Sequence, residues 1–234
     1  MDMEKRAELR RYLLIGLLAA IVTVAGGELP IGWVEYPAVE GDVSGMAGML
    51  LGSGRLSVAQ LACGVLFGGV GIPLQYYGFE AAARLVGLGG SERSARLMHW
   101  GAAATAGLGG IVHVICVALM FVCGMADLSG VTGLATIPPM VMDFALWLVM
   151  PISVVFMPLY YAMCVVLAVA VARGRTCLPR WAAVFNPLTA TVLLNALPVL
   201  LPASPVVNAL GMANMGIGSV LTFAGLLTLL PKAE

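Results

Sequence analysis

Charged side chains are scarce in this chain of 234 residues. Asp, Glu, Lys and Arg make up 10% of it and hydrophobic residues 61%, whereas an average soluble domain carries roughly 25% charged residues. Too few polar groups are present to cover a surface in water, so lipid is the expected solvent. Twelve basic residues balance twelve acidic ones. No net charge draws the chain to nucleic acid, and no nucleic-acid partner is predicted.

Motifs for catalysis within membranes and for metal binding are missing as well. The sequence has no HExxH of a metalloprotease, no GxSG of a rhomboid-type protease and no GxGD of a presenilin-type protease. It has two histidines, too few for a three-histidine site, and no CxxC pair that would predict zinc. A metal site built from Glu28, His113 and Asp143 is an alternative that we disfavour. No catalytic residue, metal ligand or cofactor is therefore predicted.

Cysteines are few, and their spacing predicts no framework of disulfides. They are Cys63, Cys116, Cys123, Cys164 and Cys177. Buried free thiols are the expected state. A disulfide between Cys63 and Cys123 near the outer face of the membrane is the alternative.

Long apolar runs, by contrast, dominate the chain. A membrane-spanning helix needs about 20 mostly apolar residues, and six such runs cover roughly 12–33, 57–86, 97–123, 142–172, 181–201 and 206–230. The fourth run is too long for one straight span, and Pro151 and Pro158 are expected to kink it. The sequence thus predicts an all-α fold, a bundle of six transmembrane helices that forms a single integral membrane domain over residues 1–234.

The positions of the basic residues predict the orientation of this bundle. With the N-terminus in the cytoplasm, the inner segments hold eleven of the twelve Lys and Arg residues, and the outer segments hold only Arg55. Lys and Arg resist translocation. Both termini are therefore predicted to be cytoplasmic in a multi-pass protein of the cytoplasmic membrane. A signal peptide at the N-terminus is the alternative, but its removal would leave five spans, which fits the charges less well.

The first outer loop gathers acidic residues. Glu28, Glu35, Glu40 and Asp42 lie within residues 27–45, which contain no Lys or Arg. Acidic residues translocate readily, so nothing retains them inside. Arg55 is expected to form an ion pair with one of these carboxylates, for which we select Asp42, because opposite charges at one interface attract.

Polar side chains within the spans form the candidate site, because each is costly in lipid unless it is paired or hydrated. Glu28 and His113 each follow an inner-boundary Arg by seventeen residues, and this length of helix rises about 25 Å. They are predicted to meet near the outer boundary of the bilayer. The other candidates in the outer half are Asp143, Asn195, Asn208 and Asn214. The functional interpretation is an outward-facing polar pocket, and the structural alternative is a hydrogen bond that only joins two spans.

Small residues recur at four-residue spacing in the second and third runs. They are Gly64 and Gly68, followed by Ala102, Ala106 and Gly110. Such stripes let helices approach closely in lipid, so they are interpreted as packing faces, through which an oligomer could also form.

A weak internal repeat accompanies these patterns. An offset of 85 residues relates Arg11 to Arg96, Glu28 to His113, and the segment PLQYY at 73–77 to PLYYA at 158–162. The offset predicts a parallel repeat of two helices.

Short motifs mark the first half of the chain, with Asn186-Pro187 following later. They are Gly27-Glu28, Arg55-Leu56, Pro73, Gly78-Phe79 and His113. This pattern resembles a bacterial family of six-span membrane proteins of unknown function, in which an Asp usually stands at the position of Glu28. The resemblance implies the fold and a location in the bilayer, and it implies no activity.

Three functions are compatible with the sequence. The first is a protein that binds or carries a small or amphipathic molecule through the outer pocket. The second is a structural or regulatory membrane subunit, and the third is a membrane-embedded enzyme with Glu28 or Asp143 as acid or base and His113 as its partner. Because no nucleophile or metal constellation is present, the sequence favours the first two. The predicted partners are the lipid bilayer and a small amphipathic ligand.

Overall fold

The computed structural model describes residues 2–40, 42 and 45–230, and every regular element among them is a helix. Lys232 and the ends of the predicted domain at 1 and 231–234 lie outside the described residues. Four helices are long and apolar enough to cross a membrane: Met3–Gly32, Val58–Leu88, Glu92–Met125 and Pro139–Ala172. The described chain is all-helical, and its four long apolar helices are those of a membrane protein.

Each long helix consists of several segments. In chain order these are α1 (Met3–Val22), η1 (Thr23–Glu28) and α2 (Leu29–Gly32); α4 (Val58–Cys63), η2 (Gly64–Gly68), α5 (Gly69–Leu74) and α6 (Tyr76–Leu88); α7 (Glu92–Ala104), η3 (Thr105–Gly109) and α8 (Gly110–Met125); and α9 (Pro139–Phe144), η5 (Ala145–Val149) and α10 (Met150–Ala172). The segments η1, η2, η3 and η5 are π-helical. Each long helix therefore contains one wider turn, a feature that is frequent at functional sites.

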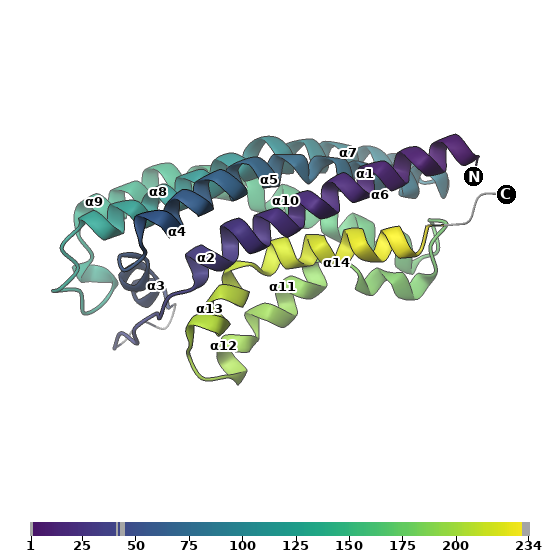
Figure 1. The fold of residues 1–234 in the computed structure, drawn as a ribbon. Helices are drawn as coiled ribbons and strands as arrows, with labels where there is room; N and C mark the ends of the chain where they lie inside the picture. The colour runs from purple at the N-terminus through teal and green to yellow at the C-terminus, as the bar shows by residue number, and fades with distance from the viewer. Residues whose placement is uncertain (1, 41, 43–44, 231–234) are drawn as a thin grey trace.

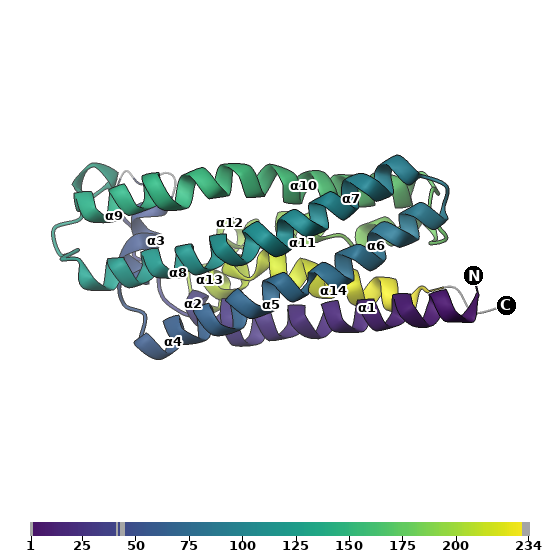
Figure 2. The ribbon, with the colours of Figure 1, turned by 90° about the horizontal axis from the view of Figure 1, so that it is seen from above.

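The four long helices form one layer. They lie side by side in chain order (Figure 2), with α1 on α6, α6 on α7, and α7 on α10. The start of α1 and the end of α14 (Asn214–Thr228) lie at one end of this layer (Figure 1), which we call the terminal end. The short helix α3 (Met46–Ser53) and α9 lie at the opposite end, which we call the loop end. The 3-10 helix η4 (Leu134–Thr136) belongs to the connection between α8 and α9.

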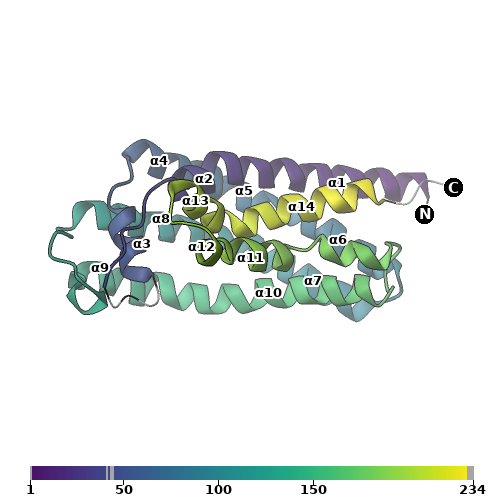
Figure 3. The same cartoon turned by 90° about the horizontal axis from the view of Figure 1, so that it is seen from below.

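A second layer of shorter helices covers one face of the first. It contains α11 (Pro187–Asn195), α12 (Leu197–Leu200), α13 (Pro205–Met212) and α14. Figure 3 shows these helices from below, lying between α1 and α10. The pair α13 and α14 is bent by 61° and is long enough to span a membrane only when both parts are counted together. The described chain thus has four long spans, or five with the bent pair.

The predicted fifth run, 181–201, is not a continuous helix. It is divided among the 3-10 helix η6 (Arg180–Val184), α11 and α12. With nine residues, α11 is about 14 Å long, roughly half of the hydrocarbon thickness of a bilayer. Hydropathy alone did not reveal the interruptions, although Pro187 and Pro198 stand at the starts of α11 and α12.

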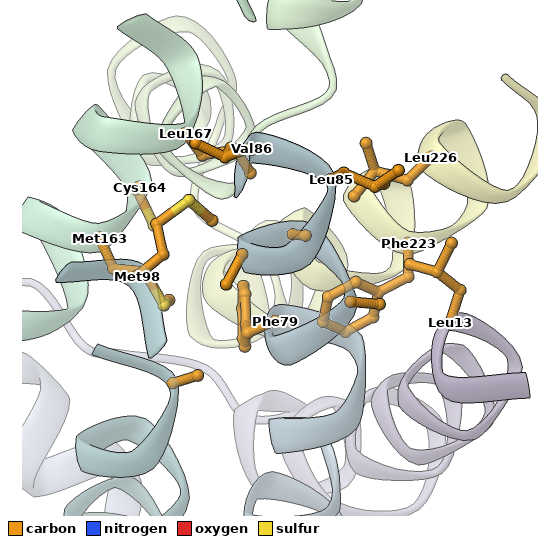
Figure 4. Close-up of a cluster of buried hydrophobic side chains, with 14 of the residues drawn as sticks. Leu13, Phe79, Leu85, Val86, Met98, Met163, Cys164, Leu167, Phe223 and Leu226 are labelled. Carbon is orange, nitrogen blue, oxygen red and sulfur yellow. The ribbon is translucent and has the colours of Figure 1, made fainter. Parts of the chain in front are cut away.

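Aromatic and aliphatic side chains join the two layers near the terminal end. Phe79 of α6 and Phe223 of α14 meet edge to face, with ring centroids 4.8 Å apart. Leu13 of α1 lies beside them, and Met98 of α7 packs in the same cluster (Figure 4). All four side chains are almost completely buried. Their burial in this cluster holds α14 against the long helices.

An ionic network strengthens the same end of the bundle. The Arg84 guanidinium donates to Glu80 at 2.9 Å and to Glu8 at 2.7 Å, and it lies over the ring of Tyr12. The second carboxylate oxygen of Glu80 lies 2.8 Å from Nδ1 of His99. These contacts tie α1, α6 and α7 together, because each of the three helices supplies part of the network.

Basic residues gather at this terminal end. Ten of the described Lys and Arg residues lie in or next to the start of α1, the end of α6, the start of α7, the end of α10, or in η6, and Arg55 lies near the loop end. One end of the bundle is therefore rich in positive charge, and the other carries a single base within the described chain.

A contact between two glycines sets how closely α1 and α6 approach. A Cβ added at Gly16 would lie 2.5 Å from the Cα of Gly78, so the backbones would have to separate. We expect Gly16→Ala to lower the free energy of unfolding by about 1–3 kcal/mol, the usual range for overpacking. Denaturant unfolding of the purified protein in detergent measures the change. Gly107→Ala in η3 is the control, since a Cβ there meets nothing within 4 Å; equal stability of the two variants would contradict the prediction.

Candidate functional site

A cavity of about 450 Å³ lies between the two helix layers, a volume within the range of small-molecule sites. Residues from all four long helices, from α3, from α12 to α14 and from the loop after α2 line it. Most of this lining is apolar and includes five flexible methionines: Met49, Met120, Met157, Met212 and Met215. A surface of this kind can adjust its shape to an apolar ligand.

Glu28 brings a carboxyl group into this apolar lining. It is the last residue of the π-helical η1, and its side chain is only 8% exposed. Gly216 of α14 leaves room for the carboxyl, because a Cβ at that position would collide with Oε2. This Oε2 atom is buried, and no group in the described chain forms a hydrogen bond with it.

Two tyrosine hydroxyls share this property. Tyr36 follows α2 and Tyr160 lies in α10; both residues line the cavity, and the buried hydroxyl of each forms no hydrogen bond of ordinary geometry with the described chain, although Ser219 and Cys164 lie near that of Tyr160. Burial raises the pKa of Tyr36 to about 12, so its hydroxyl keeps the proton at neutral pH and can donate a hydrogen bond. Together with Glu28, these are the three buried side-chain atoms without a partner among the described residues. Each such group lowers the free energy of unfolding by about 1–3 kcal/mol. Buried polar groups in a protein core normally have hydrogen-bond partners, so three unpaired ones around a single cavity are unusual.

His113 lies in α8 with its ring against η2. Its Nε2 is 3.0 Å from the carbonyl oxygen of Gly64, and since a carbonyl only accepts, Nε2 carries the proton and donates it. Nδ1 of the neutral ring is then a hydrogen-bond acceptor. A Cβ at Gly68 would occupy the place of the ring. His113 and Glu28 line the same cavity, but no ion pair between them is among those of the described residues, so the direct contact expected from the sequence is not formed.

Asn208 also lines the cavity, but its amide group is used within the protein. Its Nδ2 donates to the carbonyl of Val34 at 2.7 Å. This bond ties α13 to the segment that follows α2, next to Tyr36 in the chain. Asn208 therefore helps to close the loop end of the cavity.

Asn195 and Asn214 stand at the two breaks in the second layer, beside Ala196 and Ala213. Nδ2 of Asn214 donates to Oδ1 of Asn195 at 3.1 Å and to the carbonyl of Gly211 at 2.6 Å. Asn214 lines the cavity, whereas Asn195 is exposed and does not. Their bonds supply polar partners at the interruptions of α11–α12 and α13–α14.

Two further parts of the predicted site lie elsewhere. Asp143 is exposed on α9 and is not part of the cavity lining. Arg55 and Asp42 do not form the predicted ion pair, which is absent from the ion pairs of the described chain. The carboxylate of Asp42 instead accepts a hydrogen bond from the backbone N–H of Gly48, near the start of α3.

The predicted packing faces and the cysteines have simple surroundings. Gly64 faces Ile31 and Val117, and Gly110 faces Pro73, all within the same chain. All five cysteines are free, so the alternative Cys63–Cys123 disulfide is not formed. No group of three or more His, Cys, Asp or Glu residues that could hold a metal ion occurs in the part of the chain that the structure describes.

Sequence reasoning missed Tyr36 and Tyr160 as site residues. A tyrosine in an apolar run or at its end is ordinary, and only the fold shows that these hydroxyls are buried without a partner. The one available signal was the segment PLYYA, which contains Tyr160, and it was interpreted only as part of a repeat. The resulting site can hold an apolar body and form hydrogen bonds with one polar group.

Removal of an unpaired hydroxyl tests whether the site is unsatisfied in the free protein. We expect Tyr160→Phe and Tyr36→Phe to leave the free energy of unfolding unchanged or to raise it by about 1 kcal/mol, because each removes a buried polar group that has no partner. Thr23→Val is the contrast: it removes a hydroxyl that donates to Ala19 and accepts from Gln75, so it should destabilise the protein. Chemical unfolding in detergent compares the three variants, and a clear loss of stability in both Phe variants would refute the expectation.

Comparisons with known proteins identify a family and no activity. No curated protein and no solved structure matches this chain. One family model matches residues 1–233, nearly the whole sequence, and its description is a family of unknown function. The chain therefore belongs to this family, DUF6796.

Proposed function

We propose that this chain is an integral membrane protein that binds a small amphipathic molecule in the cavity between its two helix layers. The observation that carries the proposal is that three residues with an unpaired buried polar atom, Glu28, Tyr36 and Tyr160, all line one apolar cavity. A ligand with an apolar body and one polar group would fill the space and satisfy these atoms. Pockets with an apolar lining and a few placed polar groups are the usual form of small-molecule sites.

A purely structural subunit accounts for the cavity less well. Protein interiors are close-packed, with few voids larger than a water molecule. Near the terminal end this chain packs in that way, around Phe79 and Phe223. The space bordered by Glu28 and Tyr160 departs from it, and a role limited to joining helices gives no reason for that departure.

The same proposal includes the orientation in the membrane. The terminal end, where the basic residues gather, would face the cytoplasm, with both chain termini there and with the broken pairs α11–α12 and α13–α14 as the fifth and sixth membrane segments. The positive-inside tendency supports this arrangement. The cavity would then lie toward the outer side of the cytoplasmic membrane, because Tyr36 and Met49 line it from the loop end.

Filling the cavity tests the binding function. A Cβ at Gly211 meets nothing within 4 Å, although this residue lines the cavity, so Gly211→Phe should place a ring in the free space. With 1-aminoanthracene as a fluorescent apolar probe, and the protein in lipid nanodiscs, we expect at least tenfold weaker binding by this variant, a difference of about 1.4 kcal/mol.

Gly107→Phe serves as the matched control. Gly107 also has open space around it, but it does not line the cavity, so its replacement should leave probe binding within twofold of the unaltered chain. Protein-dependent binding that is equal in both Phe variants, or none above that of empty nanodiscs, would contradict the proposed function.

Cysteine labelling tests the orientation. In a chain without other cysteines, the exposed Cys177 should react with an impermeant maleimide only from the cytoplasmic side. A cysteine introduced at the exposed Ala38 should react only from the outside, because it lies on the loop that leads to α3 at the other end of the bundle. The reverse pattern in sealed vesicles of known orientation would refute cytoplasmic termini.

A further inference from the structure

The described residues around the cavity carry an acidic group and no strongly basic group to balance it. Among the described residues that line the cavity, Glu28 contributes the one carboxyl group, and none is a Lys or Arg. His113, the one nitrogen base among the described lining residues, directs its Nε2 proton to the carbonyl of Gly64. An anionic ligand would therefore meet a carboxyl group without any compensating base.

Hydrogen-bond acceptors also outnumber donors among the polar groups of the described cavity lining that remain free. When Glu28 is ionised, its Oε2 can only accept a hydrogen bond. Nδ1 of the neutral His113 also can only accept, whereas a tyrosine hydroxyl can either accept or donate. The unpaired hydroxyls of Tyr36 and Tyr160 fit either role. A ligand rich in N–H donors would satisfy more of these atoms than a ligand that mainly accepts.

Aromatic faces add to the preference for positive charge. The rings of Phe156 and Tyr160 both line the cavity, with their centroids 5.8 Å apart. The face of an aromatic ring attracts a cation within about 6 Å of its centroid. A metal cation is poorly served, since hard cations such as Ca²⁺ bind several oxygen ligands and Glu28 supplies the cavity's one carboxyl group.

An ionised carboxyl group in a low-dielectric cavity is strongly destabilised unless a positive charge accompanies it. Building on the proposed binding function, we propose that the ligand is an amphipathic amine, an apolar body with one protonated amino group, whose ammonium pairs with Glu28. A primary ammonium has three donors, as many as the unpaired atoms of Glu28, Tyr36 and Tyr160. The apolar body then packs against the methionines and Phe156.

Two matched series of probes separate this ligand class from its alternatives. The first is octylamine, octanol and octanoate, and the second is 1-adamantylamine, 1-adamantanol and adamantane-1-carboxylate, so that shape is constant within each series. Isothermal titration of the full chain in phosphatidylcholine nanodiscs, with empty nanodiscs subtracted, measures each affinity. We expect the amine of at least one series to bind at least tenfold more tightly than its alcohol and its carboxylate.

Substitution of the carboxyl group identifies its role. Glu28→Gln keeps the size of the side chain and should bring the affinity for the amine to within threefold of that for the alcohol. Glu35→Gln is the control, because Glu35 is an exposed carboxylate that does not line the cavity, and it should leave the preference intact. Should Glu28→Gln not fold, the order of affinities in the unaltered chain decides alone.

The outcomes distinguish this inference from the proposed function. If the alcohol or the carboxylate binds as tightly as the amine in both series, or if Glu28→Gln folds and keeps the full preference, the pairing of an amine with Glu28 is wrong while binding in the cavity stands. If no probe of either series binds above empty nanodiscs, both are overturned.

Discussion

Every backbone amide and carbonyl group within a bilayer has to find its hydrogen-bond partner inside the protein, and the irregular parts of this fold depend on that constraint. At the start of η1 the Thr23 hydroxyl donates to the carbonyl of Ala19, and at the start of η3 the Thr105 hydroxyl donates to that of Gly101, each at 2.9 Å. Asn186, just before α11, donates to the carbonyl of Cys164 at 2.8 Å. In each case a polar side chain beside the point where a helix widens or breaks donates to a backbone carbonyl, so these side chains are not left unpaired in lipid.

The widened and broken helices divide the molecule into two halves that differ in how densely they pack. Toward the terminal end, the helices are regular and pack densely around Phe79 and Phe223, with Arg84 linking three of them. Toward the loop end, α13 bends away from α14, and Glu28 ends a π-helical segment. The densely packed half supplies stability that offsets the cost of the unpaired polar groups around the cavity in the other half.

Elementary physics predicted part of this arrangement from the sequence. The low charge content predicted helices in lipid, and the cost of polar groups at membrane depth singled out Glu28 and His113, which the fold places on one cavity. Helix rise predicted that they lie at a similar level of the bundle, but it could not predict their rotation about the helix axes, because the π-helical turns change it. Hydropathy also treated 181–201 as one run, although it contains two helix breaks. The segment PLYYA could not reveal the unpaired hydroxyl of Tyr160, since the burial of this hydroxyl depends on how helices far apart in the chain pack around it.

The π-helical segments also bear on how sequences of this family vary. A π-helical turn is equivalent to one residue inserted into an α-helix, and each residue turns an α-helix by about 100°. Loss of one residue from η1 would restore regular helix there while rotating Glu28 relative to the preceding part of α1. Single-residue gaps in an alignment of relatives should therefore collect at Thr23–Glu28 and at the corresponding segments of the other long helices. A relative with such a gap in η1 would carry its acidic residue on a different face, so the lining of the cavity can change there without a change of fold.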